Sequence, residues 1–403
     1  MMDITNFIFG LAAALCSALL VYTLTPPVRV LAYLIGAVDV PTDSRRMHVK
    51  PTPRIGGLAI FAGFVVAALV FGKFNRGLWA ILSGGAILVV LGIIDDVKRL
   101  PAWVKFLVQI GAAALAVSFG LKIDYITIFG MSINFGMFSI PITILWIVAL
   151  TNAINLIDGL DGLACGVSGI MSLSLLGVVL IQGDFESAII TAVLAGACFG
   201  FLPYNTNPAR IFMGDTGALF LGYTLSIISI QGMFKLHAVL SFIVPLSLFA
   251  LPLLDTATAF IRRIIHRESP FTPDRKHLHH KLVDLGFSQK EAVRLLYAVC
   301  GMLGLVAITF TERMFGNLRL MKALIVLGAA FLVFGINYLV MKKTSTRILS
   351  GLTDHGNEKS ATPLPGDAKP TEEAEAPSGA ETTVETTGET VEKSAEETAE
   401  EDK

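Results

Sequence analysis

The sequence predicts an all-α membrane protein, a polytopic bundle of about eleven transmembrane helices. Of the 403 residues, 54% are hydrophobic and only 16% are charged, whereas about a quarter of the residues of a soluble domain are charged. The mean hydropathy of +0.69 agrees with a membrane protein. Acidic residues nevertheless form four clusters where apolar stretches end. Because an ionised aspartate at bilayer depth costs roughly 2.5–3.5 kcal/mol, these clusters indicate a polar ligand, and we expect a metal-bound phosphate.

Eleven apolar stretches approach the length that crosses about 30 Å of hydrocarbon. The first one lacks the basic leader and small-residue cleavage site of a signal peptide, so we expect a retained helix. The four cysteines lie in or beside these stretches without metal-ligand spacing, which is typical of small buried hydrophobic residues. The stretches cover residues 7–24, 56–72, 78–94, 103–120, 141–157, 165–181, 188–203, 216–230, 240–254, 294–308 and 321–341.

Charge divides the chain into a membrane domain, residues 1–345, and an acidic tail, residues 346–403. Residues 354–403 hold 15 of the 32 acidic residues and 4 of the 31 basic ones, so the remaining body is basic. The tail is rich in Glu, Thr, Ala and Pro and cannot bury enough apolar surface to offset its ordering entropy. We therefore expect the body to attract anions and the tail to be disordered.

The positions of lysine and arginine predict the orientation in the cell membrane. These residues collect in the loops around residues 45–54, 98–99 and 262–290, which the positive-inside rule places in the cytoplasm. With an odd number of helices, the N-terminus lies outside and the C-terminal tail lies in the cytoplasm. All four acidic clusters then fall on the cytoplasmic side.

The first acidic cluster is the pair Asp95 and Asp96, followed by two cations and by Lys105 about two and a half turns later. Such a group suits Mg²⁺ and a phosphate. An ordinary interfacial loop with solvated aspartates is the alternative.

In the second cluster a polar residue recurs at every third position, at Asn152, Asn155, Asp158 and Asp161. This spacing places neighbours on adjoining faces of a helix. Hard oxygen ligands with few carboxylates suit Mg²⁺ bridged to phosphate better than zinc. A helix end capped by aspartates is the alternative.

Asp215 stands between two glycines, shortly after Arg210. The glycines let the backbone approach a ligand closely. Capping of the next helix by Asp215 or Thr216 is compatible with metal binding.

We interpret residues 255–291 as a long loop, with Asp255 at its start and His277, His279 and His280 among basic residues. Imidazole and cationic donors suit a pyrophosphate. A zinc site, or a basic loop held at anionic lipid headgroups, is the alternative. Lys50 lies in a basic, proline-stiffened segment that either closes over an anionic substrate or is a plain cytoplasmic loop. No phosphate-binding or dinucleotide glycine motif occurs, and we expect no nucleic-acid partner.

Taken in order, five motifs resemble those of the polyprenyl-phosphate N-acetylhexosamine-1-phosphate transferases, and the resemblance covers residues 7–341. The motifs are Lys50 to Pro53 with Gly56 and Gly57, the pair Asp95 and Asp96, the run from Asn152 to Gly162, the run from Pro208 to Gly217, and His277 to His280.

The resemblance implies a Mg²⁺-dependent enzyme, with Mn²⁺ as an alternative ion. It moves a sugar-1-phosphate from a UDP-sugar to undecaprenyl phosphate in the membrane and releases UMP. Asp215 and Asn155 would hold the metal, and Asp95 would contact or deprotonate the lipid phosphate. We assign catalytic roles to Asp95, Asp96, Asp158, Asp161 and His279, and substrate binding to Lys50, Lys105, Asn152, Asp158, Asp161, Arg210, His277, His279 and His280.

The His-Leu-His-His pattern is similar to the N-acetylglucosamine branch of that family, which begins teichoic acid, O-antigen and related envelope polysaccharides. The muramoyl-pentapeptide branch of peptidoglycan synthesis usually has consecutive histidines, and it often has threonine where this chain has Arg54. That branch is one alternative. An ion-coupled transporter is another, because intramembrane aspartates also form proton relays. A homodimer is compatible with every one of these hypotheses.

Overall fold

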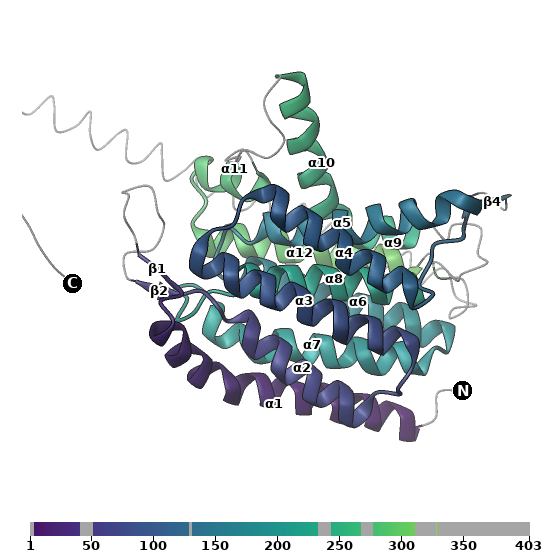
Figure 1. Ribbon diagram of the computed structural model, residues 1–403, viewed down its shortest axis with the longest axis horizontal. Coiled ribbons are helices and arrows are strands. Elements are labelled where there is room, and N and C mark those ends of the chain that lie inside the picture. The colour runs from purple at the N-terminus through teal and green to yellow at the C-terminus, as the bar shows by residue number, and fades with distance from the viewer. Residues whose placement is uncertain are drawn as a thin grey trace, which may run out of the picture. The chain divides into compact units, whose positions relative to one another are not determined.

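The computed structural model describes residues 4–40, 51–128, 131–232, 243–266 and 277–309, together with 311 and 328. Lys50, the predicted tail over residues 346–403 and, apart from residue 328, the predicted helix over residues 321–341 lie outside the described residues, so these predictions remain predictions. The described residues are mostly helical (Figure 1). The chain is a polytopic helical membrane protein.

The helices of the first 232 residues follow the predicted apolar stretches closely, with ends that differ by a few residues. The first helix is an exception, because it has 31 residues and continues past Pro26 and Pro27. The eight helices of this part are α1 (Ile4–Leu34), α2 (Gly57–Phe71), α3 (Arg76–Lys98), α4 (Ala102–Ser118), α5 (Ser139–Ile157), α6 (Leu163–Gln182), α7 (Phe185–Asn205) and α8 (Gly214–Gly232).

Among the described residues, six helices are long and apolar enough to cross a membrane, namely α1, α3, α5, α6, α7 and α12 (Gln289–Thr309). Helices α2 and α4 are apolar but shorter. The predicted total of eleven and the predicted orientation of the termini therefore remain predictions.

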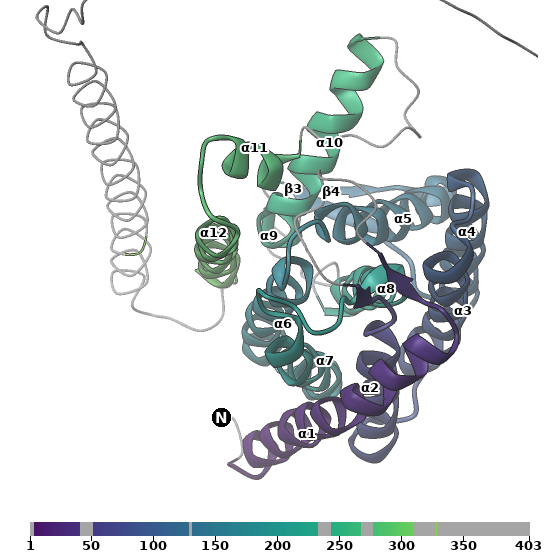
Figure 2. The same cartoon turned by 90° about the vertical axis from the view of Figure 1, so that its left-hand side faces the viewer.

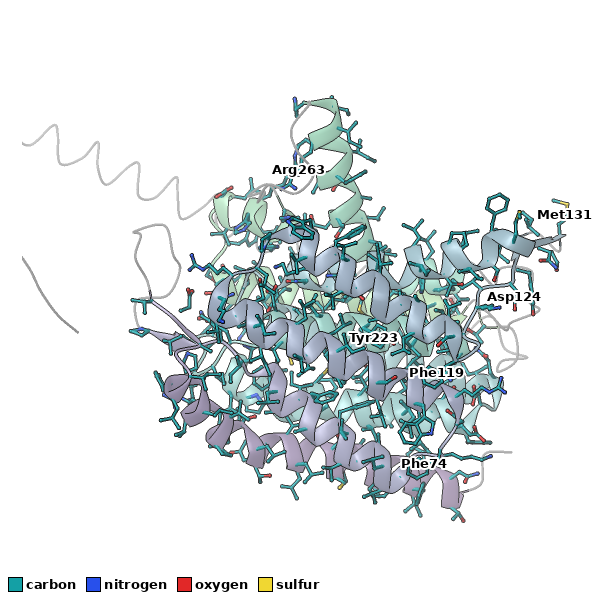
Figure 3. All side chains as sticks on the ribbon, in the orientation of Figure 1. Phe74, Phe119, Asp124, Met131, Tyr223 and Arg263 are labelled. Carbon is teal, nitrogen blue, oxygen red and sulfur yellow. The ribbon has the colours of Figure 1, made fainter. Side chains whose placement is uncertain are left out.

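Helix α8 is the core of the bundle. Nearly all its residues are buried, and Figure 2 shows it enclosed by the other helices. Helix α3 approaches it closely at Gly92, where a Cβ atom would lie 2.4 Å from the Thr216 backbone. Tyr223, in the interior of the bundle (Figure 3), donates a hydrogen bond to the Ala80 carbonyl of α3. The Gly92 contact places the start of α8 against the end of α3, whereas the Tyr223 bond joins the middle of α8 to the first turns of α3, away from that end.

The predicted single helix over residues 240–254 is wrong. Its described part contains two helices, α9 (Ile243–Leu248) and α10 (Ala250–Ile265). Pro252 has no N–H to donate to Leu248, and a proline costs least in the first turn of a helix. The break at Phe249 places it there.

The predicted long loop over residues 255–291 is also wrong. Helix α10 continues to Ile265 and projects from the bundle (Figure 1), and a short helix α11 (Leu278–Asp284) precedes α12. Apolar residues at Leu254, Phe260, Ile261 and Ile264 recur at helical spacing around Arg262 and Arg263. Arg262 and Arg263 lower the mean hydropathy of this stretch, so a search for apolar stretches alone did not identify the helix.

Two short antiparallel strand pairs qualify the all-α prediction. Strand β1 (Val38–Asp39) pairs with β2 (Thr52–Pro53), and β3 (Tyr125–Ile128) pairs with β4 (Met131–Asn134) before a 3₁₀ turn (Gly136–Phe138). The β1–β2 pair and α11 lie at one end of the bundle, and β4 lies at the other (Figure 1). Asp124 and Met131 are close to that second end in Figure 3.

Candidate active site

Asp95 lies in the last turn of α3 and closes the connection to α4. Its Oδ1 accepts a hydrogen bond from the Leu100 amide at 2.6 Å. The helix ends at Lys98, and the next residue, Arg99, has a left-handed φ of 51°. The Asp95 carboxylate therefore stabilises this sharp turn, and its Oδ2 is directed at Lys105 of α4, 3.0 Å away. Its side chain is only 9% exposed.

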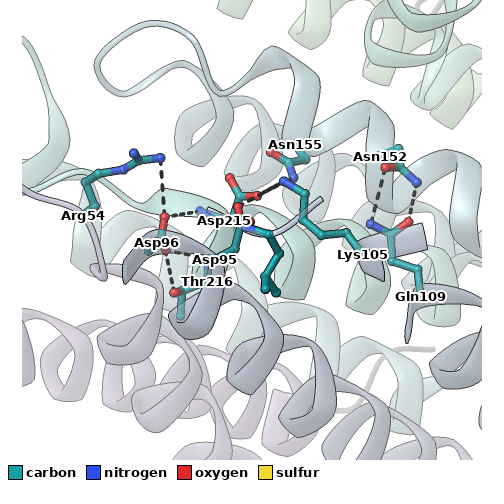
Figure 4. A network of polar contacts seen from close by, with 10 residues as sticks. Arg54, Asp95, Asp96, Lys105, Gln109, Asn152, Asn155, Asp215 and Thr216 are labelled. Carbon is teal, nitrogen blue, oxygen red and sulfur yellow. Dashed lines mark hydrogen bonds and ion pairs between the residues drawn. The ribbon is translucent and has the colours of Figure 1, made fainter. Parts of the chain in front are cut away.

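Asp96 caps the N-terminus of α8 from a different helix. Its Oδ1 accepts the Asp215 amide at 3.1 Å, and its Oδ2 accepts both the amide and the hydroxyl of Thr216, at 3.1 and 2.7 Å (Figure 4). The Arg54 guanidinium lies 3.5 Å from Oδ1, and the Asp96 side chain is fully buried. Backbone N–H groups at a helix N-terminus stabilise an anion. This geometry makes Asp96 a positioning residue for Asp215.

Two polar side chains from two further helices, α4 and α5, meet at Asp215. Lys105 Nζ lies 2.9 Å from Asp215 Oδ2, and Asn155 Nδ2 lies 3.3 Å from the same oxygen (Figure 4). The ammonium group thus bridges Asp95 and Asp215. Residues separated by more than 100 positions in the chain share one small polar region at the end of an apolar bundle.

Asn152 holds α5 against α4 one turn before Asn155. It forms a reciprocal amide pair with Gln109, one turn after Lys105, with Asn152 Nδ2 2.5 Å from Gln109 Oε1. Gln109 is buried. Because both amides are paired with each other, they lock the relative position of Lys105 and Asn155.

The turn between α5 and α6 carries Asp158 and Asp161, which have different surroundings. Asp161 Oδ2 accepts hydrogen bonds from Asn207 Nδ2 at 2.9 Å and from the Ala209 amide at 3.0 Å. It therefore holds the loop that contains the cis Asn207–Pro208 bond. Burial raises the pKa of Asp158 to about 8, and the nearby carboxylates of Asp215 and Asp96 act in the same direction. A bound cation would favour its ionised form.

The histidine segment, residues 277–280, lies at the start of α11 and contacts α10 through Asp255. His277 Nδ1 lies 3.0 Å from Asp255 Oδ2, and the Leu278 amide donates to Asp255 Oδ1 at 2.8 Å. Burial raises the pKa of Asp255, but these hydrogen bonds outweigh it and the pKa falls below its ordinary value. Asp255 therefore anchors α11.

His279 lies directly over the α5–α6 turn. Its Nε2 is within 2.3 Å of where a Cβ atom of Gly159 would be. This nitrogen is buried and has no hydrogen-bond partner in the described part of the chain, and its ring packs against His280 with centroids 4.3 Å apart. Burial lowers the pKa of His279 to about 4, and His280 adds to this. The imidazole of His279 is therefore neutral, and its Nε2 lies beside the turn without a hydrogen-bond partner among the described residues.

The structure brings together most of the predicted site residues, although their contacts differ. Asp95, Asp96, Lys105, Asn155 and Asp215 form one network, to which Asn152 is linked through Gln109. Asp158 is close enough to influence this network electrostatically. Arg210 is exposed on the loop before α8, and Lys50 lies outside the described residues.

Sequence reasoning missed several residues that hold the site. For Arg54 it left the contact open, and the structure pairs Arg54 with Asp96. The sequence does contain a sign of the role of Gln109, because it is a lone amide in an apolar stretch, one helical turn after Lys105. No such sign exists for Asn207, which contacts both Asp161 and Gln289, because these segments meet only in the folded chain.

The donor set at Asp215 fits a hard divalent cation. In the described part of the chain, no group of three or more His, Cys, Asp or Glu side chains is arranged to hold a metal. Mg²⁺ is commonly held by one or two carboxylates together with phosphate oxygens and water. Asp95 and Asp215 each direct one carboxylate oxygen at the ammonium group of Lys105. Rotation of the Asn155 side-chain amide would place its oxygen beside Asp215 as a further ligand.

A protein-family model matches the part of the chain that contains most of the candidate site. The family model described as glycosyl transferase family 4 matches residues 78–233. That range includes the acidic pair of α3, the α5–α6 turn and the start of α8.

Named relatives match over most of their length. A probable undecaprenyl-phosphate N-acetylglucosaminyl 1-phosphate transferase of Bacillus subtilis (strain 168) is 44% identical over 291 residues, which are 71% of this chain and 81% of that relative. A decaprenyl-phosphate N-acetylglucosaminephosphotransferase of Mycobacterium tuberculosis (strain ATCC 25618 / H37Rv) is 36% identical, over 79% of this chain and 87% of that relative. A phospho-N-acetylmuramoyl-pentapeptide-transferase of Chlorobium phaeobacteroides (strain BS1) is 32% identical, over 55% and 70%.

Proposed function

Because the chain belongs to the polyprenyl-phosphate N-acetylhexosamine-1-phosphate transferases, we propose that it transfers N-acetylglucosamine-1-phosphate from UDP-N-acetylglucosamine to undecaprenyl phosphate and releases UMP. The observation that carries this proposal is the convergence of Asp95, Lys105 and Asp215 at one end of an apolar bundle. Phosphoryl transfer depends mainly on positioning and charge neutralisation. The reaction is the first membrane step in the synthesis of an envelope polysaccharide such as teichoic acid or O-antigen.

The acceptor phosphate is placed near Asp95 and Lys105. Lys105 donates to Asp95 and Asp215 at 3.0 and 2.9 Å, and its ammonium group can exchange either contact for a phosphate oxygen. The freed Asp95 oxygen can then accept the proton of the lipid phosphate.

The nucleotide half of the site is formed by the α5–α6 turn and the histidine segment. Asp158 and Asp161 line the nucleotide pocket in this proposal. His277, His279 and His280 contact the pyrophosphate, and the unpartnered Nε2 of His279 supports this. Lys50, Asn152 and Arg210 complete the set of substrate-binding residues.

Asp215 and Asn155 hold Mg²⁺ in this proposal, with Mn²⁺ as an alternative ion. The cation supplies neutralisation of the charge on the phosphate oxygens. The chain itself places the ligands: Asp96 fixes the amides at the start of α8, and the Gln109–Asn152 pair fixes α5 against α4.

We place the enzyme in the plasma membrane with its site facing the cytoplasm, where UDP-sugars occur. The basic loops near the site support this orientation. It implies an N-terminus outside and a cytoplasmic tail, with about eleven transmembrane helices and a homodimer as a compatible assembly.

The test measures UMP release by the purified protein with UDP-N-acetylglucosamine, undecaprenyl phosphate and Mg²⁺. We expect turnover that EDTA abolishes and that added Mg²⁺ restores. UDP-N-acetylmuramoyl-pentapeptide, offered in parallel, is the substrate of the alternative branch, and turnover with that substrate alone would contradict the proposal. Membership of a transferase family argues against the transporter hypothesis, and an absence of ion flux in vesicles that release UMP would exclude it.

A further inference from the structure

The backbone of the α5–α6 turn is held only by short-range hydrogen bonds of its own. It leaves helical geometry at Asp158, and Gly162 has a left-handed φ of 79°. The amides of Asp158, Gly159 and Leu163 donate to the carbonyls of Asn155, Ile157 and Leu160, at 3.2, 2.8 and 3.0 Å. These bonds set the local shape of the turn, and contacts from other elements add restraints on its position.

Helix α12 supplies one such contact through a tyrosine hydroxyl. Tyr297 Oη donates to the Gly162 carbonyl at 2.5 Å. At Gly166, one turn into α6, a Cβ atom would lie 2.0 Å from this hydroxyl, so glycine makes room for it. The Gly162 carbonyl already accepts the Gly166 amide at 2.9 Å. The tyrosine is therefore not needed to satisfy that carbonyl, and its bond adds a restraint on the direction of the turn.

The first residue of α12 supplies a second contact. Gln289 Oε1 accepts a hydrogen bond from Asn207 Nδ2 at 2.6 Å, and the same nitrogen donates to Asp161 Oδ2 at 2.9 Å. Gln289 thus orients the amide that holds Asp161. Two residues on one helix restrain the turn at two points, at the Asp161 side chain and at the Gly162 backbone.

We propose that α12 is a positioning element for the α5–α6 turn and that Tyr297 and Gln289 are positioning residues for Asp158 and Asp161. The kinetic part of this inference rests on the proposed function, because it assigns the turn to the nucleotide. Just before α12, α11 places His279 over Gly159 of the same turn. The segment of α11 and α12 therefore contacts the turn directly at Gly159 and Gly162, and it reaches Asp161 through Asn207.

The test compares Tyr297→Phe with Tyr223→Phe. Both substitutions remove only a hydroxyl that donates to a backbone carbonyl beside a glycine. Tyr223 is fully buried, so its loss affects folding at least as much, but it contacts Ala80 and Ala112 rather than the turn.

For Tyr297→Phe we expect KM for UDP-N-acetylglucosamine to rise about tenfold, the effect of one lost hydrogen bond. The KM for undecaprenyl phosphate should stay within about twofold. Amide hydrogen exchange of residues 158–166 should become faster. Tyr223→Phe should change neither the KM values nor this exchange.

Wild-type behaviour of Tyr297→Phe in either measurement overturns the positioning role. If wild-type protein releases no UMP, the proposed function fails, while the exchange comparison still decides whether α12 restrains the turn. Should Tyr297→Phe fail to fold, Gln289→Ala, at the partly exposed start of α12, carries the same two measurements.

Discussion

Asp96→Asn tests whether Asp96 acts by placing Asp215. The carboxylate accepts three hydrogen bonds, from the amides of Asp215 and Thr216 and from the Thr216 hydroxyl. Asparagine has one acceptor oxygen, so one buried N–H at the start of α8 faces an NH₂ group instead. An unsatisfied buried donor costs about 1–3 kcal/mol, and loss of the anion at a helix N-terminus adds up to about 2 kcal/mol. We expect a loss of about 3 kcal/mol in stability.

A shift of the first turn of α8 also moves the Asp215 carboxylate. Because a displacement of about 1 Å can reduce turnover about 100-fold, we expect kcat to fall by that order after correction for folded protein. Thermal unfolding in detergent measures the stability, and initial rates of UMP release measure kcat.

Asp184→Asn is the matched control. Asp184 caps α7 at the opposite end of the bundle, where it accepts the Ser187 amide at 3.1 Å and the Ser187 hydroxyl at 2.7 Å. This variant should lose stability and keep kcat within about twofold. Equal kcat losses in the two variants, or wild-type kcat in Asp96→Asn, would refute the positioning role of Asp96.

Three further predictions follow from the site. Asp215→Asn should lower kcat at least about 1000-fold with the fold retained, which circular dichroism and UMP release check together; near-normal turnover would remove Asp215 from the metal site. Lys105→Met removes the cation between Asp95 and Asp215, so added Mg²⁺ should raise the Tm of this variant more than that of the wild type; equal shifts would contradict a shared site. The pKa of His279 is about 4 in the fold, below its ordinary value of 6.5, so the unfolded chain binds more protons. Stability present above pH 6.5 should fall by about 3 kcal/mol towards pH 4. Thermal unfolding at several pH values measures this dependence, which should be weaker in His279→Gln and unchanged in the control His266→Gln, where the histidine is exposed. An equal dependence on pH in the wild type and His279→Gln would contradict the prediction.

Apolar length alone predicted the helices up to residue 232, because a membrane-spanning segment must be both long and apolar. The same criterion failed at α9 and α10. There Pro252 ends one helix early, and Arg262 and Arg263 make the next one amphipathic. Helical periodicity, rather than mean hydropathy, is the pattern that indicates α10.

The identity of the acidic residues could be read from the sequence, but their roles could not. Asp95 and Asp96 are adjacent and chemically alike, yet Asp95 contacts Lys105 whereas Asp96 caps α8. That difference depends on which helix approaches each carboxylate in the folded bundle. The same limit applies to Arg54, whose partner Asp96 is 42 positions away.

The hydrogen bonds of the acids also indicate which of them remain able to bind a ligand. Four carboxylates of the site accept hydrogen bonds from backbone amides, which compensates for their burial: Asp95, Asp96, Asp161 and Asp255. Among the described residues, Asp215 accepts only from side chains, and Asp158 has no hydrogen bond from its carboxylate. A carboxylate oxygen that already accepts a backbone amide cannot change partners without disturbing the fold. We therefore propose that ligands exchange at Asp158, at Asp215 and at Oδ2 of Asp95, where the hydrogen bonds are to side chains or absent.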